Sequence, residues 1–249
     1  MNLKSVLIII LQAVCFTLPA QTTFLQQQKS YSRVRTAIAE KEKAVKENLR
    51  KNRLTPDSVH ILITVFKSEK QLEIYAKNKT DSTCSKIASY NICRSSGKLG
   101  PKRKEGDGQV PEGFYHIDRF NPFSNFYLSL GINYPNLSDR KKSHAEKLGG
   151  DIFIHGSCVT IGCLPMTDNV IKEIYLYAVL ARNNGQSKIP VYIFPFRMTD
   201  VNFNAYQQKY KANEELIAFW TNLKTGYDKF EKEKRTLNVS VNKNGDYVF

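Results

Sequence analysis

A histidine and a cysteine eight positions apart, His155 and Cys163, are the residues of this sequence best suited to covalent chemistry. A cysteine attacks carbonyl groups as a thiolate, so it needs a nearby imidazole to take its proton. The acyl intermediate also needs backbone N–H groups aimed at its oxyanion, and Gly162 would let such a backbone approach closely. The apolar run 152–154 predicts a buried strand that ends at His155, a common place for reactive groups. The pattern indicates a thiol nucleophile with its base.

The residues between this histidine and cysteine each have more than one interpretation. Cys158 is a rival nucleophile, a reversible disulfide partner for Cys163, or a small buried hydrophobic residue. Ser157 and Thr160 carry hydroxyl groups that either orient His155 or satisfy a local turn. Zinc bound by His155, Cys158 and Cys163 is disfavoured, because their spacing is not a standard zinc pattern. We expect no metal and no cofactor.

Three features outside this segment also invite a functional interpretation. Arg197 would hold a substrate carboxylate or a structural aspartate equally well. Tyr134, with Phe126 and Tyr127, would line a groove for a sugar-linked peptide, although such aromatic residues are more often part of the core. The Gly-Asp-Gly segment 106–108 lacks the alternating oxygen ligands of a calcium loop, so it predicts a glycine-permitted turn.

The first twenty residues predict a secretory signal peptide. Lys4 supplies a positive start, an apolar run extends from Val6 to Leu18, and Ala20 is a small residue suited to cleavage before Gln21. The run is too short to cross a bilayer comfortably, and an uncleaved anchor is the alternative. The sequence thus predicts an exported protein of the periplasm or cell envelope, which contacts a membrane only through an uncleaved signal segment.

Export affects which bonds the cysteines can form and which partners the net positive charge can attract. Disulfides form outside the cytoplasm, so Cys84 and Cys93 are either a bridge or two free buried thiols. The chain has 37 Lys and Arg against 23 Asp and Glu, a formal net charge of +14, and loss of Lys4 with the signal peptide leaves 36 against 23, or +13. Because the lysines are scattered and no base-stacking motif accompanies them, we expect cell-wall carboxylates and membrane phosphates as polyanionic partners, and no nucleic acid.

The chain has no internal repeat and no linker, and it is long enough for one substantial core. We expect one domain with additions: the signal peptide (1–20), an N-terminal helical extension (21–57), a catalytic domain (58–200), and a C-terminal extension of helix and hairpin (201–249).

Helical spacing predicts three helices, at 29–52, from an N-cap at Thr167 to about Asn183, and at 214–234 around Trp220. Strand patterns occur at 59–66, 72–75, 84–93, 113–117, 152–154 and 189–194, and in a final hairpin around Asn244-Gly245. The long polar loop 94–111 is expected to serve function.

Short motifs in a fixed order, from about residue 58 to 200, carry a resemblance to a known family. They are Gly100-Pro101-Lys102, Gly106-Asp107-Gly108, Pro111 to Tyr115, Ile132 to Asn136, Ser138-Asp139-Arg140, Gly149-Gly150, His155-Gly156, Gly162-Cys163, Met166-Thr167-Asp168, Glu173-Ile174-Tyr175, Gly185-Gln186 and Phe194 to Met198. Together they resemble the L,D-transpeptidase catalytic domain family, also called YkuD-like, and within it the YafK-like branch.

The resemblance implies a mainly β, α+β fold: a mixed β-sheet catalytic domain with an N-terminal helix and peripheral C-terminal helices. It implies Cys163 as the nucleophile and His155 as the proton donor and acceptor, with Thr160 in the Ser/Thr position of the family. The supporting residues, which include candidate backbone donors for the oxyanion, are Gly156, Ser157, Thr160, Ile161 and Gly162. Arg197 and Tyr134 are the candidates for substrate binding.

The function implied is that of an exported cysteine acyltransferase acting on peptidoglycan stem peptides. Cys163 would attack the L-centre carbonyl of a diaminopimelate residue to form a thioester, while His155 protonates the amine leaving group and then deprotonates the acceptor. Ile161 stands where the broader family has histidine, and the gap from His155 to Cys163 is short. Both are features of the YafK-like branch, which includes hydrolytic members. The alternatives are therefore an L,D-amidase that detaches wall-linked protein from the same bond, and a non-catalytic peptidoglycan-binding relative.

Overall fold

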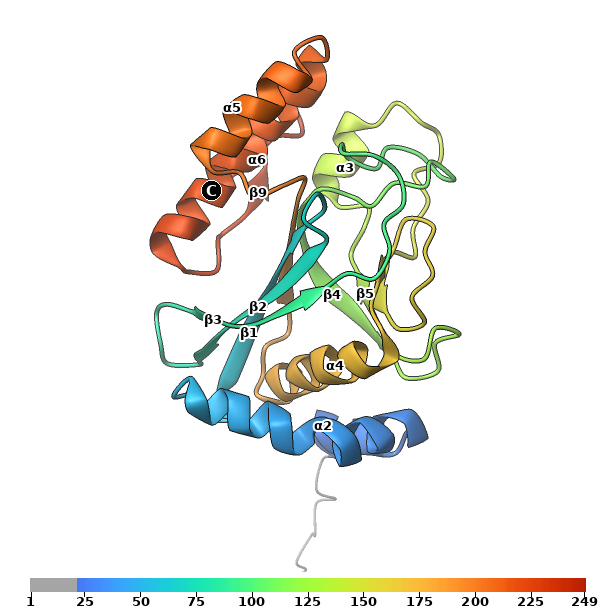
Figure 1. Ribbon diagram of the computed structural model, residues 1–249, viewed down its shortest axis with the longest axis vertical. Coiled ribbons are helices and arrows are strands. Elements are labelled where there is room, and N and C mark those ends of the chain that lie inside the picture. The colour runs from blue at the N-terminus through green and yellow to red at the C-terminus, as the bar shows by residue number, and fades with distance from the viewer. Residues whose placement is uncertain (1–21) are drawn as a thin grey trace, which may run out of the picture.

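A curled, eight-stranded mixed sheet forms the centre of the molecule (Figure 1), in the order β3-β2-β1-β8-β4-β5-β6-β7. The computed structural model describes residues 22–249, so the predicted signal peptide lies outside the described residues. The strands are β1 (Val59–Phe66), β2 (Gln71–Asn78), β3 (Ser85–Asn91), β4 (Gly113–Asn121), β5 (Ser129–Ile132), β6 (Phe153–His155), β7 (Leu164–Pro165) and β8 (Ile189–Phe194). The predicted α+β class with a mixed sheet is confirmed.

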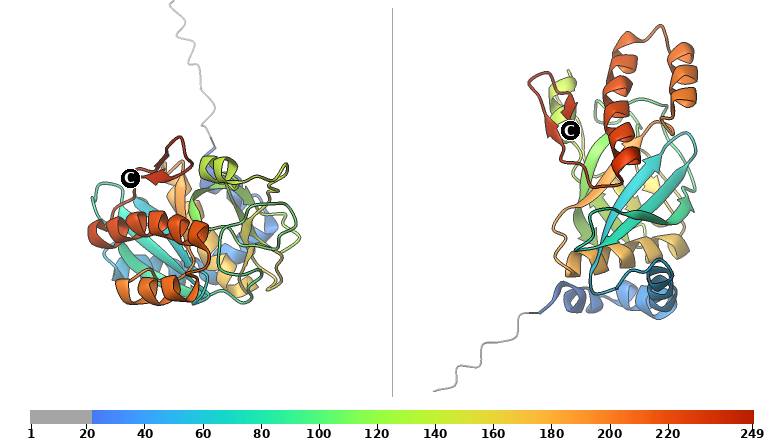
Figure 2. Two further views of the ribbon diagram at one scale, coloured as in Figure 1. Left: turned by 90° about the horizontal axis from the view of Figure 1, so that it is seen from above. Right: turned by 90° about the vertical axis from the view of Figure 1, so that its left-hand side faces the viewer.

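Helices cover the sheet on two sides (Figures 1 and 2). One side carries α1 (Phe24–Lys29), α2 (Ser32–Lys51) and α4 (Asp168–Asn183); the other carries α5 (Asp200–Lys209), α6 (Glu214–Glu233) and the hairpin of β9 (Ser240–Val241) and β10 (Tyr247–Val248). The short helix α3 (Leu137–Lys142) lies beside this hairpin, where the Ser138 hydroxyl donates to the carbonyl of Gly245. Within residues 22–249, no helix is long and apolar enough to cross a membrane.

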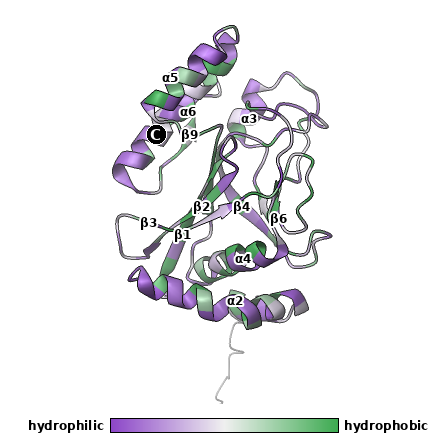
Figure 3. Cartoon of the chain, in the orientation of Figure 1, coloured by the Kyte–Doolittle hydropathy of each residue, from purple (hydrophilic) through white to green (hydrophobic). Residues whose placement is uncertain are grey.

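Strands β1 and β8 are mostly hydrophobic and almost entirely buried because both faces of the sheet are covered there. In β1, Ile61 and Ile63 belong to the core beneath α4, whereas Leu62 and Phe66 belong to the core that contains Trp220 of α6. Successive side chains of a strand point to opposite faces, so one strand supplies both cores. Figure 3 shows this concentration of hydrophobic residues on the central strands and on α4.

Helix α4 is the element that the N-terminal helices cover. The Thr167 hydroxyl caps it by accepting from the Val170 N–H at 3.3 Å. Two buried tyrosines then join it to its neighbours: the Tyr175 hydroxyl donates to Gln28 of α1, and the Tyr177 hydroxyl accepts from Asn48 of α2, both at 2.8 Å. These side-chain bonds fix the N-terminal extension to the domain.

Most of the predicted elements are present. The hairpin of β1 and β2, the strand β3, the helices α4 and α6 with the Thr167 cap, and the final hairpin are confirmed. The helix predicted at 29–52 is confirmed as α2, which begins at Ser32 and ends at Lys51. The total of three helices is wrong, because α1, α3 and α5 are also present in the part of the chain that the structure describes. Helix α5 buries only Phe203, so its sequence has little amphipathic pattern to detect.

Candidate active site

Strand β6 ends at His155 and places this side chain in the interior. The strand pairs with β5 on one side and with β7 on the other, and His155 is only 1% exposed. The chain then turns at Gly156, whose N–H donates to the carbonyl of Phe126 at 3.0 Å. A Cβ at Gly156 would lie 2.5 Å from Asp168 Oδ1 and 2.9 Å from that carbonyl oxygen, so only glycine fits this turn.

The imidazole of His155 is held in one orientation. Its Nδ1 lies 2.6 Å from the carbonyl oxygen of Gly156, and a carbonyl only accepts, so Nδ1 carries the proton and Nε2 keeps its lone pair. The ring of Phe126 lies against the imidazole, with 4.6 Å between the ring centroids. Burial lowers the pKa of His155 below its usual 6.5, although the hydrogen bond to Gly156 opposes this effect. The histidine is a neutral base at neutral pH.

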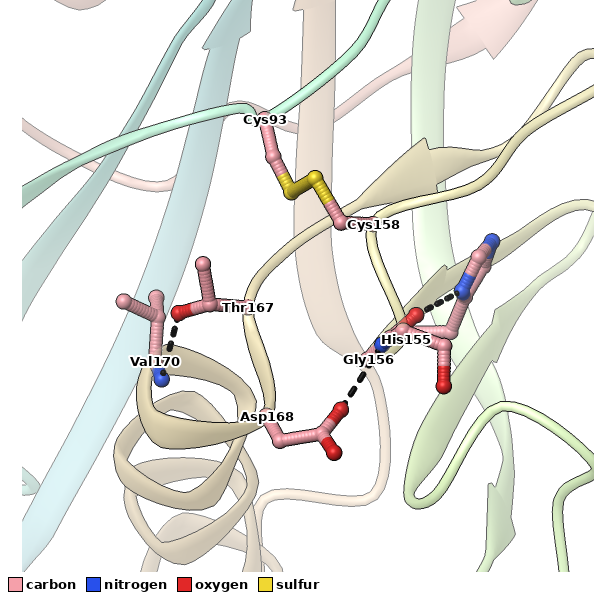
Figure 4. The surroundings of a disulfide bond; sticks show 8 residues. Cys93, His155, Gly156, Cys158, Thr167, Asp168 and Val170 are labelled. Atoms are coloured by element: carbon pink, nitrogen blue, oxygen red, sulfur yellow. Dashed lines mark hydrogen bonds between the residues drawn. A yellow bond between two sulfur atoms is a disulfide. The ribbon is translucent and has the colours of Figure 1, made fainter.

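The turn after His155 is tied to the start of α4 (Figure 4). Asp168, the first residue of that helix, accepts the Ser157 N–H at 2.8 Å. Ser157 and Cys158 have φ values of +66° and +45°, a left-handed conformation that L-residues adopt only where the surroundings hold it. Asp168 supplies part of that support.

A disulfide joins Cys158 to Cys93, across 65 positions of sequence (Figure 4). Cys93 lies two residues after the end of β3, and its N–H donates to the carbonyl of Pro165 in β7 at 3.0 Å. Of the two alternatives considered for Cys84 and Cys93, a bridge between them is wrong, and the alternative of two free thiols is correct for Cys84 alone, because the end of β3 approaches the turn after His155. Cys84 is a free, buried thiol that donates to the carbonyl of Lys234. Cys158 is neither the nucleophile, nor a partner of Cys163, nor a free buried thiol.

Cys163 lies at the end of a short loop that leads into β7. Its N–H donates to Thr160 Oγ1 at 2.9 Å, and the same hydroxyl donates back to the carbonyl of Cys163 at 2.8 Å. The N–H of Gly162 donates to Ser96 Oγ at 2.7 Å. Gly162 has a φ of +91°, and a Cβ there would lie 3.1 Å from the carbonyl oxygen of Gln109. Thr160 thus positions the loop that carries Cys163 rather than His155, while Ile161 is 85% exposed.

The Cys163 thiol is protonated at rest. Burial raises its pKa above the usual 9.0, with a smaller opposing effect from the backbone of Phe153, and its S–H donates to the carbonyl of Asp151 at 3.5 Å. His155 is paired with Pro165 in the parallel register of β6 and β7, and Cys163 lies two positions before Pro165, directly before β7 begins. Within residues 22–249, no hydrogen bond joins the imidazole to the thiol. Catalytic hydrogen bonds often tighten only when substrate is bound.

Cys163 lines a cleft of about 220 Å³. The turn between β1 and β2 and the segment 92–99 form most of its walls, and Val110 and Leu164 complete them. Much of the polar loop predicted to have a functional role therefore lies next to Cys163. The cleft exposes the region of the thiol, whereas the imidazole of His155 is buried and is not among the residues that line the cleft.

A buried ion pair holds this loop in place. Lys67 Nζ lies 2.8 Å from Glu112 Oε1, and it also donates to the carbonyls of Gly100 and Val110 at 2.8 Å. The other oxygen of Glu112 accepts from the indole N–H of Trp220 at 2.8 Å. Burial lowers the pKa of Lys67, and Glu112 opposes that effect. Helix α6 is thereby connected to the wall of the cleft.

Comparison with known proteins agrees with this arrangement. Residues 60–193 match the family model described as the L,D-transpeptidase catalytic domain. The chain belongs to this family. It is 40% identical over 190 residues to the Escherichia coli protein whose provisional name is L,D-transpeptidase YafK, in strain K12 and in O157:H7, covering 76% of this chain and 73% of that protein.

Two solved structures are also similar to the L,D-transpeptidase chain described here. The helical cell shape determining protein Pgp2 of Campylobacter jejuni is 21% identical with a TM-score of 0.44, and the match covers 74% of each chain. Bd1075 of Bdellovibrio bacteriovorus is 24% identical with a TM-score of 0.39, covering 57% of this chain and 50% of that one.

Two residues considered for substrate binding in this L,D-transpeptidase have structural partners. Arg197 Nη2 lies 2.6 Å from Glu73 Oε1, and its guanidinium lies over the ring of Phe66. Tyr134 is 5% exposed, and its hydroxyl donates to the carbonyl of Leu148 at 3.2 Å. Neither residue lines the cleft that contains Cys163.

The Gly-Asp-Gly segment of the L,D-transpeptidase domain is a turn built around its aspartate, as predicted. Asp107 accepts from Lys102 Nζ at 2.7 Å and from the N–H groups of Arg103, Lys104 and Gln109. Gly106 and Gly108 both have positive φ, which the turn requires. These contacts stabilise the loop that leads to the cleft.

Sequence reasoning missed four contacts of this L,D-transpeptidase site, although each involves a residue that it had found. Ser96 accepts the N–H of Gly162, Asp168 accepts that of Ser157, Phe126 covers His155, and Cys93 is bonded to Cys158. Ser96 has no individual interpretation in the sequence, whereas Phe126 was considered for a groove, Asp168 stands in one of the family motifs, and Cys93 was considered as a partner of Cys84. The contacts themselves were missed because their partners lie 11 to 66 positions apart.

Proposed function

We propose that this member of the L,D-transpeptidase family is an exported cysteine acyltransferase acting on peptidoglycan stem peptides in the periplasm or cell envelope. One observation carries the proposal: Cys163 opens into a cleft, and on the adjacent strand a neutral His155 keeps its Nε2 lone pair free. A protonated thiol beside a neutral imidazole is the resting state that general-base activation requires.

In the first step, His155 Nε2 takes the proton of Cys163. The thiolate sulfur then bonds to the L-centre carbonyl carbon of diaminopimelate, and the carbonyl π electrons move to oxygen. The N–H groups of Cys163 and Gly162 are the candidate donors to this oxyanion, and Ile161 N–H is a further one. In the resting state the first two are bonded to the hydroxyls of Thr160 and Ser96, which would have to give way. Each such donor contributes roughly 3 to 4 kcal/mol to transition-state stabilisation.

In the second step, the imidazolium of His155 gives its proton to the leaving amine as the carbon–nitrogen bond breaks, which leaves a thioester on Cys163. An acceptor amine then attacks the thioester carbon and gives a proton to His155; as the carbon–sulfur bond breaks, His155 passes that proton to the leaving sulfur, which restores the thiol. Water in place of the amine would give hydrolysis by the same residues. The acceptor therefore distinguishes a transpeptidase from an amidase that releases a wall-linked protein.

The test is product analysis of the full-length chain with a defined diaminopimelate tetrapeptide, a muropeptide dimer and a stem linked to a short peptide. We expect new dimers and a transient mass increase on the protein. Cys163→Ala should abolish both, whereas Cys84→Ser, which alters the other free thiol, should retain them. Free stems without dimers would show an amidase. Turnover by Cys163→Ala would overturn the assigned nucleophile, and binding to cell-wall sacculi without adduct or turnover would overturn the enzyme.

A further inference from the structure

The cleft beside Cys163 carries a strongly positive wall. Among the residues that line it, four are basic and none is acidic; the basic ones are Lys67, Lys70, Arg94 and Lys98. Three serines, Ser68, Ser95 and Ser96, also line it. A concave surface of one charge sign attracts ligands of the opposite sign and raises their local concentration.

Three of these four cations are available to a ligand. Lys67 is occupied, because its ammonium group is buried against Glu112 and two carbonyl groups. Lys70, Arg94 and Lys98 are exposed, and no ion pair of residues 22–249 includes them. Their charges therefore face the solvent-filled cleft without a carboxylate of the protein to neutralise them.

The backbone that carries these three residues is well anchored. The carbonyl of Lys70 accepts the Ile92 N–H at 2.8 Å, which joins the β1–β2 turn to the segment that precedes Arg94. The N–H of Lys98 donates to Gln109 Oε1 at 2.7 Å. The disulfide of Cys93 fixes the residue directly before Arg94. Cations on an anchored backbone lose less freedom when they bind, so they favour a defined ligand position.

We infer that Arg94, together with Lys70 and Lys98, forms a carboxylate-binding subsite that selects the acyl donor. The inference rests on the proposed function, since it takes the substrate to be a stem peptide attacked by Cys163. A tetrapeptide donor has two carboxylates near the attacked carbonyl: that of the terminal D-alanine, in the leaving group, and that of the D-centre of diaminopimelate, on the side chain. The planar guanidinium of Arg94 is suited to hold either one in a bidentate pair.

The test compares steady-state kinetics of the full-length chain on three tetrapeptides: one with both carboxylates free, one amidated at the diaminopimelate D-centre, and one amidated at D-alanine. We expect Arg94→Gln to raise KM for the free substrate about tenfold, as loss of a charge-assisted hydrogen bond does, with kcat little changed. Lys70→Gln and Lys98→Gln should have smaller effects in the same direction. Lys43→Gln and Arg50→Gln, which remove exposed charges from α2, are the matched controls.

The amidated substrates identify the bound carboxylate. Amidation of the carboxylate that Arg94 binds should raise the wild-type KM about tenfold, and Arg94→Gln should then have no further effect on KM. Amidation of the other carboxylate should change neither the wild-type KM nor the effect of Arg94→Gln on it. Equal effects of Arg94→Gln on all three substrates, or no effect at all, would overturn the subsite. A separate binding measurement distinguishes failure of the subsite from failure of the proposed function. Calorimetry with Cys163→Ala measures tetrapeptide binding without turnover. Loss of affinity in the Arg94→Gln, Cys163→Ala double variant would support the subsite even if the wild type turned over no substrate.

Discussion

The Nδ1 atom of His155 lies 2.6 Å from the carbonyl oxygen of Gly156, the next residue in the chain. The bond selects one tautomer and directs Nε2 away from the backbone that carries it. The N–H of Gly156 donates to the carbonyl of Phe126, so the orientation of the His155 imidazole depends on a loop from another part of the sheet.

We predict that His155 is neutral at pH 7 with its proton on Nδ1. Burial lowers its pKa below 6.5, so the imidazole gains a second proton only at lower pH, and the acid limb of kcat/KM should fall below pH 6.5. Nitrogen-15 NMR of the ring, assigned with a His155→Asn variant, checks both the tautomer and the titration. A resting imidazolium at pH 7 would contradict the general-base step.

Alkylation of Cys163 by iodoacetamide should be slow at pH 7 and accelerate above pH 9. Burial raises the pKa of this thiol above 9.0, and only the thiolate reacts. The rate is followed by intact-protein mass, with Cys163→Ala as the control for reaction at Cys84. A rate that already levels off by pH 7 would instead indicate a preformed thiolate–imidazolium pair.

Removal of the disulfide should weaken both stability and activity. The Cys93→Ser, Cys158→Ser variant should lose about 4 kcal/mol of unfolding free energy, because the bond closes a long loop. Its kcat should also fall, since the bond joins the turn after His155 to the wall of the cleft. Urea unfolding and turnover measure the two effects, and Cys84→Ser serves as the control. Unchanged turnover would show that the turn keeps its geometry without the bond.

Arg197→Met should destabilise the protein without affecting KM. The variant leaves the carboxylate of Glu73, which is 1% exposed, with the partly exposed Lys86 as its one cationic partner in residues 22–249 and the Tyr75 hydroxyl as a neutral donor, at a cost of about 2 kcal/mol. Burial raises the pKa of Glu73, but hydrogen bonds from Arg197 and Lys86 outweigh it and hold the pKa below 4.5. The contribution is present above pH 4.5 and is lost as pH falls further. A raised KM in a stably folded variant would return Arg197 to substrate binding.

Glu112→Gln should be among the most destabilising substitutions near the cleft. It leaves the ammonium group of Lys67 buried without a counter-charge, at a cost of about 3 kcal/mol. Trp220→Phe removes the hydrogen bond to the second carboxylate oxygen together with part of the buried indole, and should cost about 2 kcal/mol. Thermal unfolding of both variants checks this order. A larger loss in Trp220→Phe would assign the main role to packing of the indole.

Much of the fold could be predicted from local patterns. The strands at 59–66 and 189–194 are long apolar runs, and the Thr167 cap marks the start of α4. These elements are therefore determined by residues close together in the sequence. Helix α5 was not predicted, because only Phe203 of its residues is buried and its stability depends on what surrounds it.

The candidate site likewise has features that the sequence predicts and contacts that depend on the tertiary structure. The sequence by itself indicated His155 and Cys163 as the candidate pair, each beside a glycine, and determined the family, because motif order and short spacing are properties of the chain alone. Only the tertiary structure decided that Cys93 forms a disulfide with Cys158, that Ser96 accepts a hydrogen bond from the Gly162 N–H, and that Arg197 forms an ion pair with Glu73. Those contacts join residues 65 to 124 positions apart, and the curl of the sheet, rather than any local preference, determines which of them meet.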